Sequence, residues 1–215
     1  MPDLVLLVIL LVFVGCLLLT RRLSFLGQKP EDYAATSPAI DIRHHLSGPI
    51  LCEGVIYGPT GRVNSRFIAE MEGRWDGDHG TLTEHFRYAG GNDQYREWHL
   101  TLGGDGRIRG EAEDIVGHGA GWQKGATVLL RYRIRLPENA GGWTLDVTDW
   151  MYLMENGSII NRSQFRKFGF KVAELVATMR PAQTTATATR PEKGAPQVTA
   201  AATAPPAPSE RTQAA

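Results

Sequence analysis

The sequence predicts an all-β fold, an antiparallel up-and-down barrel of about 8–10 strands, which follows an N-terminal membrane helix. Polar and apolar residues alternate along successive segments between residues 52 and 178, which is the pattern of half-buried strands. Clusters of Gly, Asn, Asp and Pro separate these segments, and no helical period lies between them. Consecutive antiparallel strands must protect their edges. Closure into a barrel does so most directly, with a two-sheet sandwich as the alternative.

An uninterrupted apolar segment begins the chain. Residues 4–19 read "LVLLVILLVFVGCLLL" and contain no charge. As a helix they would span about 24 Å, short of the roughly 30 Å hydrocarbon core, and Thr20 with the basic residues after it would make up the difference. We therefore expect residues 1–22 to form a membrane helix that contacts the bilayer through residues 4–20.

Two alternatives to an uncleaved anchor stay open for this segment. A cleaved signal peptide usually begins with positive charge, whereas this chain begins "MPD". Lipidation at Cys16 is the second alternative, although Phe13 is a poor match three residues before it. Arg21, Arg22 and Lys29 follow the span and no basic residue precedes it, which by the positive-inside rule favours a cytoplasmic barrel.

Composition divides the rest of the chain. Residues 23–44 are expected to form a linker and residues 45–180 the barrel. Residues 181–215 are rich in Ala, Thr, Pro and Gln and lack aromatic residues, so they cannot bury enough apolar surface to offset their ordering entropy. We predict a disordered tail. Lys and Arg number 23, as do Asp and Glu, and without a basic stripe nucleic acid is not an expected partner.

The segment "RVNSRFIAEMEGRW", residues 62–75, shows the alternation that predicts strands. One face carries Val63, Phe67, Ala69, Met71 and Trp75, and the other carries arginines and glutamates. Further alternating segments cover residues 81–88, 95–102, 107–116, 127–136, 143–154, 158–166 and 168–178. The dipeptide Asn156–Gly157 is the strongest short hairpin signal among the turns.

A glycine-rich stretch, "DIVGHGAGWQKG" at residues 114–125, raises the question of a phosphate-binding loop. Such a loop needs a helix after its glycines. Here residues 127–136 alternate instead, with Leu130 and Tyr132 on one face, which predicts another strand. The G-K-[ST] pattern is also missing. We interpret the glycines as bends, bulges and a wide connection between strands.

Charged residues with the parity of the apolar face are expected to point into the barrel. When Leu102 pairs with Ile108 around the turn at residues 103–106, Arg96 comes to lie opposite Asp114. The sequence therefore predicts an inward Arg96–Asp114 ion pair. The alternative is a purely structural pair that fixes the strand register.

The Asn156–Gly157 hairpin predicts a second inward pair. A two-residue turn there would place Met151 opposite Arg162, and Arg162 would then lie diagonal to Asp149. A structural role is again the alternative.

Glu84 is the strongest single candidate for contact with a ligand. It has the parity of Phe86, its expected cross-strand neighbour is Leu100, and these registers place no cation beside it. An inward carboxylate in apolar surroundings either has a raised pKa or meets another group. A structural hydrogen bond to a backbone amide or to Tyr88 is the alternative. Tyr88 and Trp98 share the inward parity and complete the predicted lining.

The sequence contains no recognisable cofactor, metal or nucleophile motif. His85 and His99 have outward parity, and His44 and His45 precede the barrel, so no third ligand is spaced to complete a metal site. Cys52 is solitary and is expected in the core. We therefore predict no cofactor and no metal.

Several motifs resemble those of an uncharacterised bacterial family of lipocalin-like domains. They are "GRVNSRF", "WDGDHGTLTEHFRY", "REWHL", "GEAEDIVGHGAG", "DWMYL" and "KFGF", and the resemblance covers roughly residues 45–178. It implies a lipocalin-like barrel without established activity, in a membrane-anchored protein or lipoprotein that faces the envelope. This conflicts with the orientation that the positive-inside rule favours, and the side of the membrane stays open.

The resemblance also extends to individual charged residues. The family's glutamate, arginine and two aspartates match Glu84, Arg96, Asp114 and Asp149. Thr148 stands where the family often has a second acid, and Gly119 where it has alanine. These departures weaken any two-carboxylate site near Asp149.

These observations favour a membrane-tethered protein, in the inner membrane or the envelope, that binds a small or lipidic ligand inside its barrel. One alternative is an enzyme with Glu84 as general acid or base, which the missing nucleophile and cofactor motifs disfavour. The other is a packed barrel that serves as an interaction domain. The residue patterns predict neither the identity of the ligand nor the oligomeric state.

Overall fold

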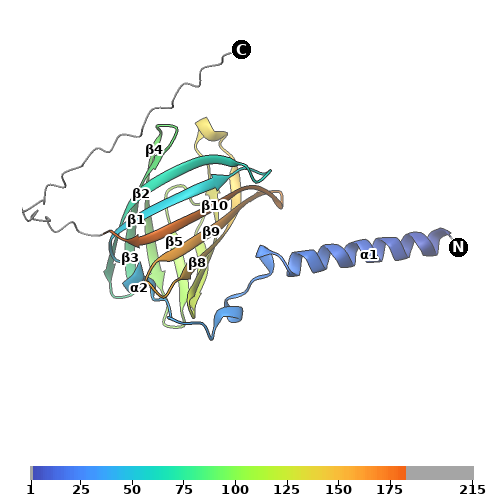
Figure 1. The fold of residues 1–215 in the computed structure, drawn as a ribbon, viewed down its shortest axis with the longest axis horizontal. Coiled ribbons are helices and arrows are strands. Elements are labelled where there is room, and N and C mark those ends of the chain that lie inside the picture. The colour runs from blue at the N-terminus through green and yellow to red at the C-terminus, as the bar shows by residue number, and fades with distance from the viewer. Residues whose placement is uncertain (1, 183–215) are drawn as a thin grey trace, which may run out of the picture. The chain divides into compact units, whose positions relative to one another are not determined.

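The computed structural model describes residues 2–182, in which ten antiparallel strands close into one barrel (Figure 1). Each strand pairs with its neighbours in sequence, and β1 pairs with β10. The strands are β1 (Gly48–Tyr57), β2 (Val63–Asp76), β3 (His79–Tyr88), β4 (Asp93–Leu102), β5 (Arg107–Glu111), β6 (Gly119–Lys124), β7 (Thr127–Arg135), β8 (Thr144–Leu153), β9 (Ile159–Lys167) and β10 (Phe170–Pro181). The predicted closed antiparallel barrel is confirmed.

The chain before the barrel is helical in four places. The α-helix α1 (Pro2–Arg22) comes first, and its Asp3–Thr20 segment has a mean hydropathy of 2.9, so it is long and apolar enough to cross a membrane. Short elements follow, namely η1 (Phe25–Gly27), η2 (Pro30–Tyr33) and α2 (Ile42–His45). The predicted tail lies outside the described residues from residue 183 onward.

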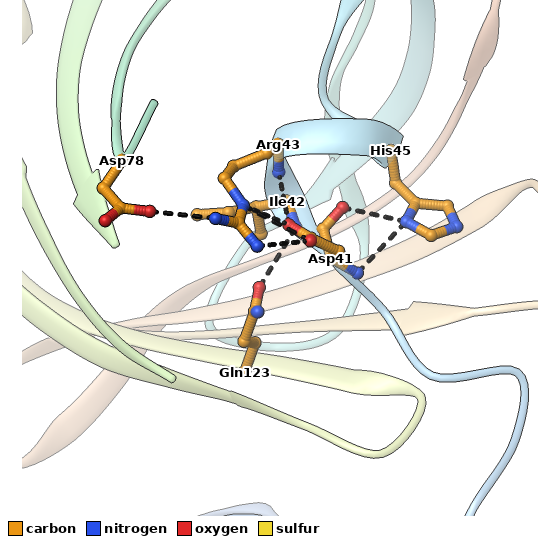
Figure 2. A network of polar contacts seen from close by, with 6 residues as sticks. All are labelled: Asp41, Ile42, Arg43, His45, Asp78 and Gln123. Carbon is orange, nitrogen blue, oxygen red and sulfur yellow. Dashed lines mark hydrogen bonds and ion pairs between the residues drawn. The ribbon is translucent and has the colours of Figure 1, made fainter. Parts of the chain in front are cut away.

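The helix α2 closes one end of the barrel. Its Ile42 is 1% exposed and contacts the barrel core, as does Leu46 just after it. Figure 2 shows the polar contacts that hold it. The Ile42 backbone N–H donates to Gln123 Oε1 on β6 at 3.0 Å, and the Arg43 guanidinium donates to Asp78 in the β2–β3 turn at 2.9 Å. The apolar face of α2 therefore covers the barrel end at which β1 begins.

Replacing Ile42 by alanine is expected to lower the free energy of unfolding by about 2 kcal/mol, because a fully buried aliphatic side chain is truncated. The backbone N–H that Gln123 accepts stays in place. The measurement is chemical denaturation of the full chain. Ile68→Ala is the matched control, since Ile68 is 46% exposed on β2 and should change the midpoint little. Equal losses in the two variants would contradict the closure by α2.

Residues of the predicted linker pack on the outer wall of the barrel. Phe25 is 9% exposed and forms a small apolar cluster with Leu129 of β7 and Trp150 of β8. The ring of Tyr33 meets that of Trp150 edge to face, with centroids 5.4 Å apart. Leu129 and Trp150 have outward parity, so this cover explains why apolar residues occupy both faces of these strands.

The glycine-rich connection was interpreted as bends, whereas Gly119–Lys124 forms the strand β6 between β5 and β7. The interpretation was therefore incomplete, although its rejection of a following helix holds, since β7 follows. Glycine is required inside this strand: a Cβ added to Gly121 would lie 2.0 Å from the Leu129 backbone oxygen. Close approach of two backbones is a recognised use of glycine in a sheet.

The register predicted at Asn156–Gly157 was wrong by one residue. Leu153 pairs with Ile159, and Met151 lies opposite Asn161 rather than Arg162. Gly157 has φ of +79° but Asn156 has no positive φ, so the two-residue type I′ turn is replaced by a three-residue loop that ends in a left-handed glycine. A slip of one residue exchanges the faces of a strand, which turns Arg162 outward.

Candidate functional site

The barrel encloses a cavity of about 290 Å³. Most of its lining is aliphatic and aromatic, and Ile42 and Leu46 line it at the end that α2 covers. The strands alternate in direction, so the turn after β7 lies at the other end, where the exposed residues Arg135 and Pro137 also line the cavity. The cavity therefore reaches the surface at the end opposite α2.

Glu84, Arg96 and Asp114 form an ion cluster in this cavity. The Arg96 guanidinium donates to Asp114 through Nη2 at 2.7 Å and through Nε at 3.0 Å, and Nη1 lies 3.4 Å from Glu84 Oε2. The predicted inward Arg96–Asp114 pair is confirmed. Asp114 lies in the β5–β6 connection, whose backbone is tied to β7 by a hydrogen bond from the Arg135 N–H to the Asp114 carbonyl.

The expectation that Glu84 lacks a cation was wrong. The β3–β4 register places Arg96, rather than Leu100, directly opposite Glu84. The side chains of Glu84 and Arg96 are 10% and 14% exposed, so a single buried guanidinium contacts two carboxylates.

Burial raises the pKa of Glu84 to about 7; the Arg96 guanidinium opposes this shift, and the nearby carboxylates of Asp149 and Asp114 add to it. Burial disfavours the charge on Arg96, but the attraction of Glu84 and Asp114 outweighs it and raises the pKa of the guanidinium. Arg96 therefore stays charged, whereas Glu84 exchanges a proton near neutral pH.

Asp149 of β8 is the centre of a second polar group in the cavity. Its Oδ1 accepts a hydrogen bond from Ser163 Oγ at 2.8 Å and a further one from Asn161 Nδ2. Burial raises the pKa of Asp149 to about 6, against the lowering effect of these two hydrogen bonds and of Arg96. The sequence analysis missed Asn161 and Ser163, because the one-residue slip at the β8–β9 loop assigned them to the outer face.

Arg162 does not belong to the cavity, and the predicted Asp149–Arg162 pair was wrong. The Arg162 side chain is 45% exposed and its Nε donates to Glu174 Oε1 at 2.6 Å. Its guanidinium also lies 4.9 Å from the centre of the Phe25 ring. Through its contact with Phe25, Arg162 therefore helps to hold the segment after α1 against the outer wall of the barrel.

Aromatic side chains surround the two polar groups. Tyr88 and Trp98 line the cavity, and the Tyr88 hydroxyl donates to Gln94 Oε1 at 3.0 Å. The Trp98 ring packs edge to face on Tyr132, with centroids 5.2 Å apart. Tyr132 was not among the predicted site residues, although its inward parity on β7 was the signal that could have identified it.

The family described as "Protein of unknown function (DUF3833)" matches residues 19–181, a range that includes all ten strands and every charged residue of the cavity. The chain belongs to the DUF3833 family. No curated protein matches the sequence. Among solved structures, the crystal structure of Rv2717c from M. tuberculosis is similar, with a TM-score of 0.49 and 17% identity over 69% of this chain and 99% of that chain.

Other reactive side chains of this DUF3833 barrel lie in unreactive settings. Burial, together with the nearby carboxylates of Glu84, Glu53 and Asp149, raises the pKa of the Cys52 thiol to about 12, so it stays protonated at neutral pH. His85 bonds Asp93 at 3.0 Å on the outer face. Across residues 2–182, no three His, Cys, Asp or Glu residues are grouped as metal ligands.

Proposed function

We propose that this chain is a membrane-tethered, lipocalin-like binding protein that holds a small, mainly apolar or lipidic ligand in its barrel. The observation that carries the proposal is the cavity: it is closed by α2 at one end, reaches the surface at the other, and combines an apolar lining with a few buried polar groups. Such a combination is typical of small-molecule sites, in which polar groups fix the orientation of an otherwise apolar ligand.

The tether is supported by α1. Its apolar segment is uncharged between Asp3 and Arg21, and Phe25, which is packed on the outer wall, follows Arg22 after only two residues. Three residue steps span at most about 11 Å, so the helix must end close to the barrel wall. The barrel would then be held near the bilayer surface, where a lipidic ligand is available.

The proposed binding can be tested by native mass spectrometry of the full chain purified in lipid nanodiscs. We expect an added mass that persists under gentle ionisation. In Ala173→Trp the adduct should fall severalfold, because Ala173 is partly exposed and lines the cavity on β10, where an indole would fill space. Val176→Trp, on the outer face of the same strand, is the control and should keep the adduct. Equal adducts in both variants would contradict an interior site.

An enzyme is the second candidate function, and the observation that favours it is Glu84. A buried carboxyl whose pKa lies near 7 has the proton affinity that general acid–base catalysis needs. Glu84→Gln would then abolish conversion of the bound molecule while leaving its retention in place. For a binding protein, the same substitution would change affinity alone.

A further inference from the structure

The cavity contains more negative than positive groups. Its interior carboxylates are the buried Glu84 and Asp149 and the half-buried Asp114, against the single interior cation Arg96. The other arginine of the lining, Arg135, is exposed at the opening. All three nitrogens of the Arg96 guanidinium already contact Asp114 or Glu84. Asp149 therefore has no cation of its own.

The Asp149 carboxylate is directed into the cavity with one oxygen unused. The residue is 8% exposed, and both of its hydrogen bonds, from Ser163 and Asn161, end on Oδ1. No residue in the described part of the chain donates to Oδ2. Neutral donors stabilise a buried carboxylate only in part, and an ionised one without a cation costs several kcal/mol.

A second polar side chain of the cavity lies on the strand next to Asp149. Asp149 of β8 pairs with Leu130 of β7, and Tyr132 is the next residue of β7 on the same face, so Asp149 and Tyr132 are diagonal neighbours. Both line the cavity. The Tyr132 hydroxyl makes no hydrogen bond to any of residues 2–182, and its oxygen is available to a ligand.

An anionic ligand does not fit this arrangement. A carboxylate or phosphate would have to displace Asp114 or Glu84 from Arg96, and it would enter a cavity that already holds an excess of negative charge. A positively charged group would instead meet the unused oxygen of Asp149 and relieve that excess.

Resting on the proposed interior binding, we propose that the ligand is an apolar molecule that carries a protonated amine. The ammonium group donates to Asp149 Oδ2 and to the Tyr132 hydroxyl, and the apolar part lies against the aliphatic lining between them and α2. Ser163 and Asn161 hold the carboxylate in position through Oδ1.

The proton affinities of the two buried carboxyls agree with this arrangement. The pKa values of Glu84 and Asp149 are raised to about 7 and about 6, so a proton partly replaces the missing cation when no ligand is bound. The other ionisable groups that interact with Asp149 are Arg96, Tyr132 and Cys52, which keep their protons at neutral pH. Asp114, which also lines the cavity, is paired with Arg96. An ammonium group competes with that proton, and its affinity should rise between pH 5 and pH 7.5.

The experiment compares three probes of equal chain length, namely octylamine, octanol and octanoate. Each is titrated by calorimetry at pH 7.5 into the full chain in lipid nanodiscs, with empty nanodiscs subtracted for partition into lipid. The alkylamine is protonated at this pH. We expect octylamine to bind at least about tenfold more tightly than the other two, the ratio that one charge-assisted hydrogen bond supplies.

Two substitutions locate the amine. Asp149→Asn should weaken octylamine at least about tenfold and change octanol less than about threefold. Asp146→Asn is the matched control, since Asp146 lies on the outer face of the same strand and carries the same charge. Tyr132→Phe removes only a hydroxyl without a protein partner, so it should fold normally and weaken octylamine severalfold. It tests the site independently of how Asp149→Asn folds.

The outcomes separate the two proposals. If octanol or octanoate binds as tightly as octylamine, the proposal of an amine ligand is wrong, while the proposal that the barrel binds a ligand in its interior is unaffected. If octylamine keeps its advantage in both Asp149→Asn and Tyr132→Phe, the placement at Asp149 is wrong. If no probe binds above the nanodisc background, interior binding of small amphiphiles fails, and the amine proposal fails with it.

Discussion

Replacing Arg96 by methionine is expected to lower the free energy of unfolding by about 3–5 kcal/mol at pH 7, because the change leaves the buried Glu84 and the half-buried Asp114 without their cation. Glu84 and Asp114 both contact this guanidinium, and no other cation contacts Glu84 in the described chain. Methionine keeps most of the side-chain volume, so the lost charge dominates the effect. Urea denaturation of the full chain measures it.

Arg74→Met is the control for this substitution. Arg74 is 78% exposed and pairs with Glu72 on the surface of β2, so its replacement should cost less than about 0.5 kcal/mol. Adding Glu84→Gln to Arg96→Met should recover at least about 1 kcal/mol, since the uncompensated charge is then removed. A double variant as unstable as Arg96→Met alone would show that Arg96 acts through packing against Phe86 and Trp98 rather than through charge.

The two hairpin registers show how much of the site the sequence could predict. In the β3–β4 hairpin the predicted partner of Glu84 was four residues away from the true one, Arg96. An even shift keeps every side chain on its face, so the inward direction of both residues was predicted correctly while the ion pair was missed. Glycines in the connecting turn permit several loop lengths, and only the folded backbone selects one.

In the β8–β9 hairpin the predicted register differed from the observed one by one residue, an odd number. The dipeptide Asn156–Gly157 is compatible with a two-residue loop and with a three-residue loop, and the φ of Asn156 decides between them. The one-residue difference exchanged Arg162 for Asn161 and Ser163 in the interior. Alternation along the strands was therefore enough to predict the closed barrel, but not which polar residues meet Asp149.

The sequence indicates the packing of residues 25–33 on the outer wall less clearly than it indicates the barrel. Leu129 and Trp150 break the alternation of β7 and β8 with apolar residues on the outward face, which indicates cover on that face. Which segment supplies the cover depends on contacts distant in sequence. The Tyr33–Trp150 ring contact joins residues far apart in the chain, and no local pattern predicts such a contact.

The interior carboxyls are expected to make the ligand-free barrel less stable as the pH rises from about 4 to about 7. Folding raises the pKa of Asp149 from 3.8 to about 6 and that of Glu84 from 4.5 to about 7. Since the folded state binds these protons more tightly than the unfolded chain, their contribution is full below about pH 4 and is lost as the pH passes the folded values. Each shift of about two units corresponds to on the order of 3 kcal/mol.

Surface carboxyls act in the opposite direction, so the interior effect is best measured as a difference between variants. The pKa values of Asp41 and Glu53 are lowered, chiefly by hydrogen bonds from Arg43 and Arg180, and their contribution is lost as the pH falls. Asp149→Asn resembles the protonated side chain. It should therefore match the unfolding free energy of the original chain at pH 4 and exceed it by about 2–3 kcal/mol at pH 7.5.

Asp146→Asn, which removes one negative charge from the outer face of the same strand, serves as the control. If Asp149→Asn were less stable than the original chain at pH 7.5, the carboxylate would be a net stabilising group, and the argument for a missing cation would fail. The expected variant is instead more stable and less able to bind an amine. A site that is strained when empty and relieved by its ligand has this combination, because the free energy lost by burying the charge is recovered on binding.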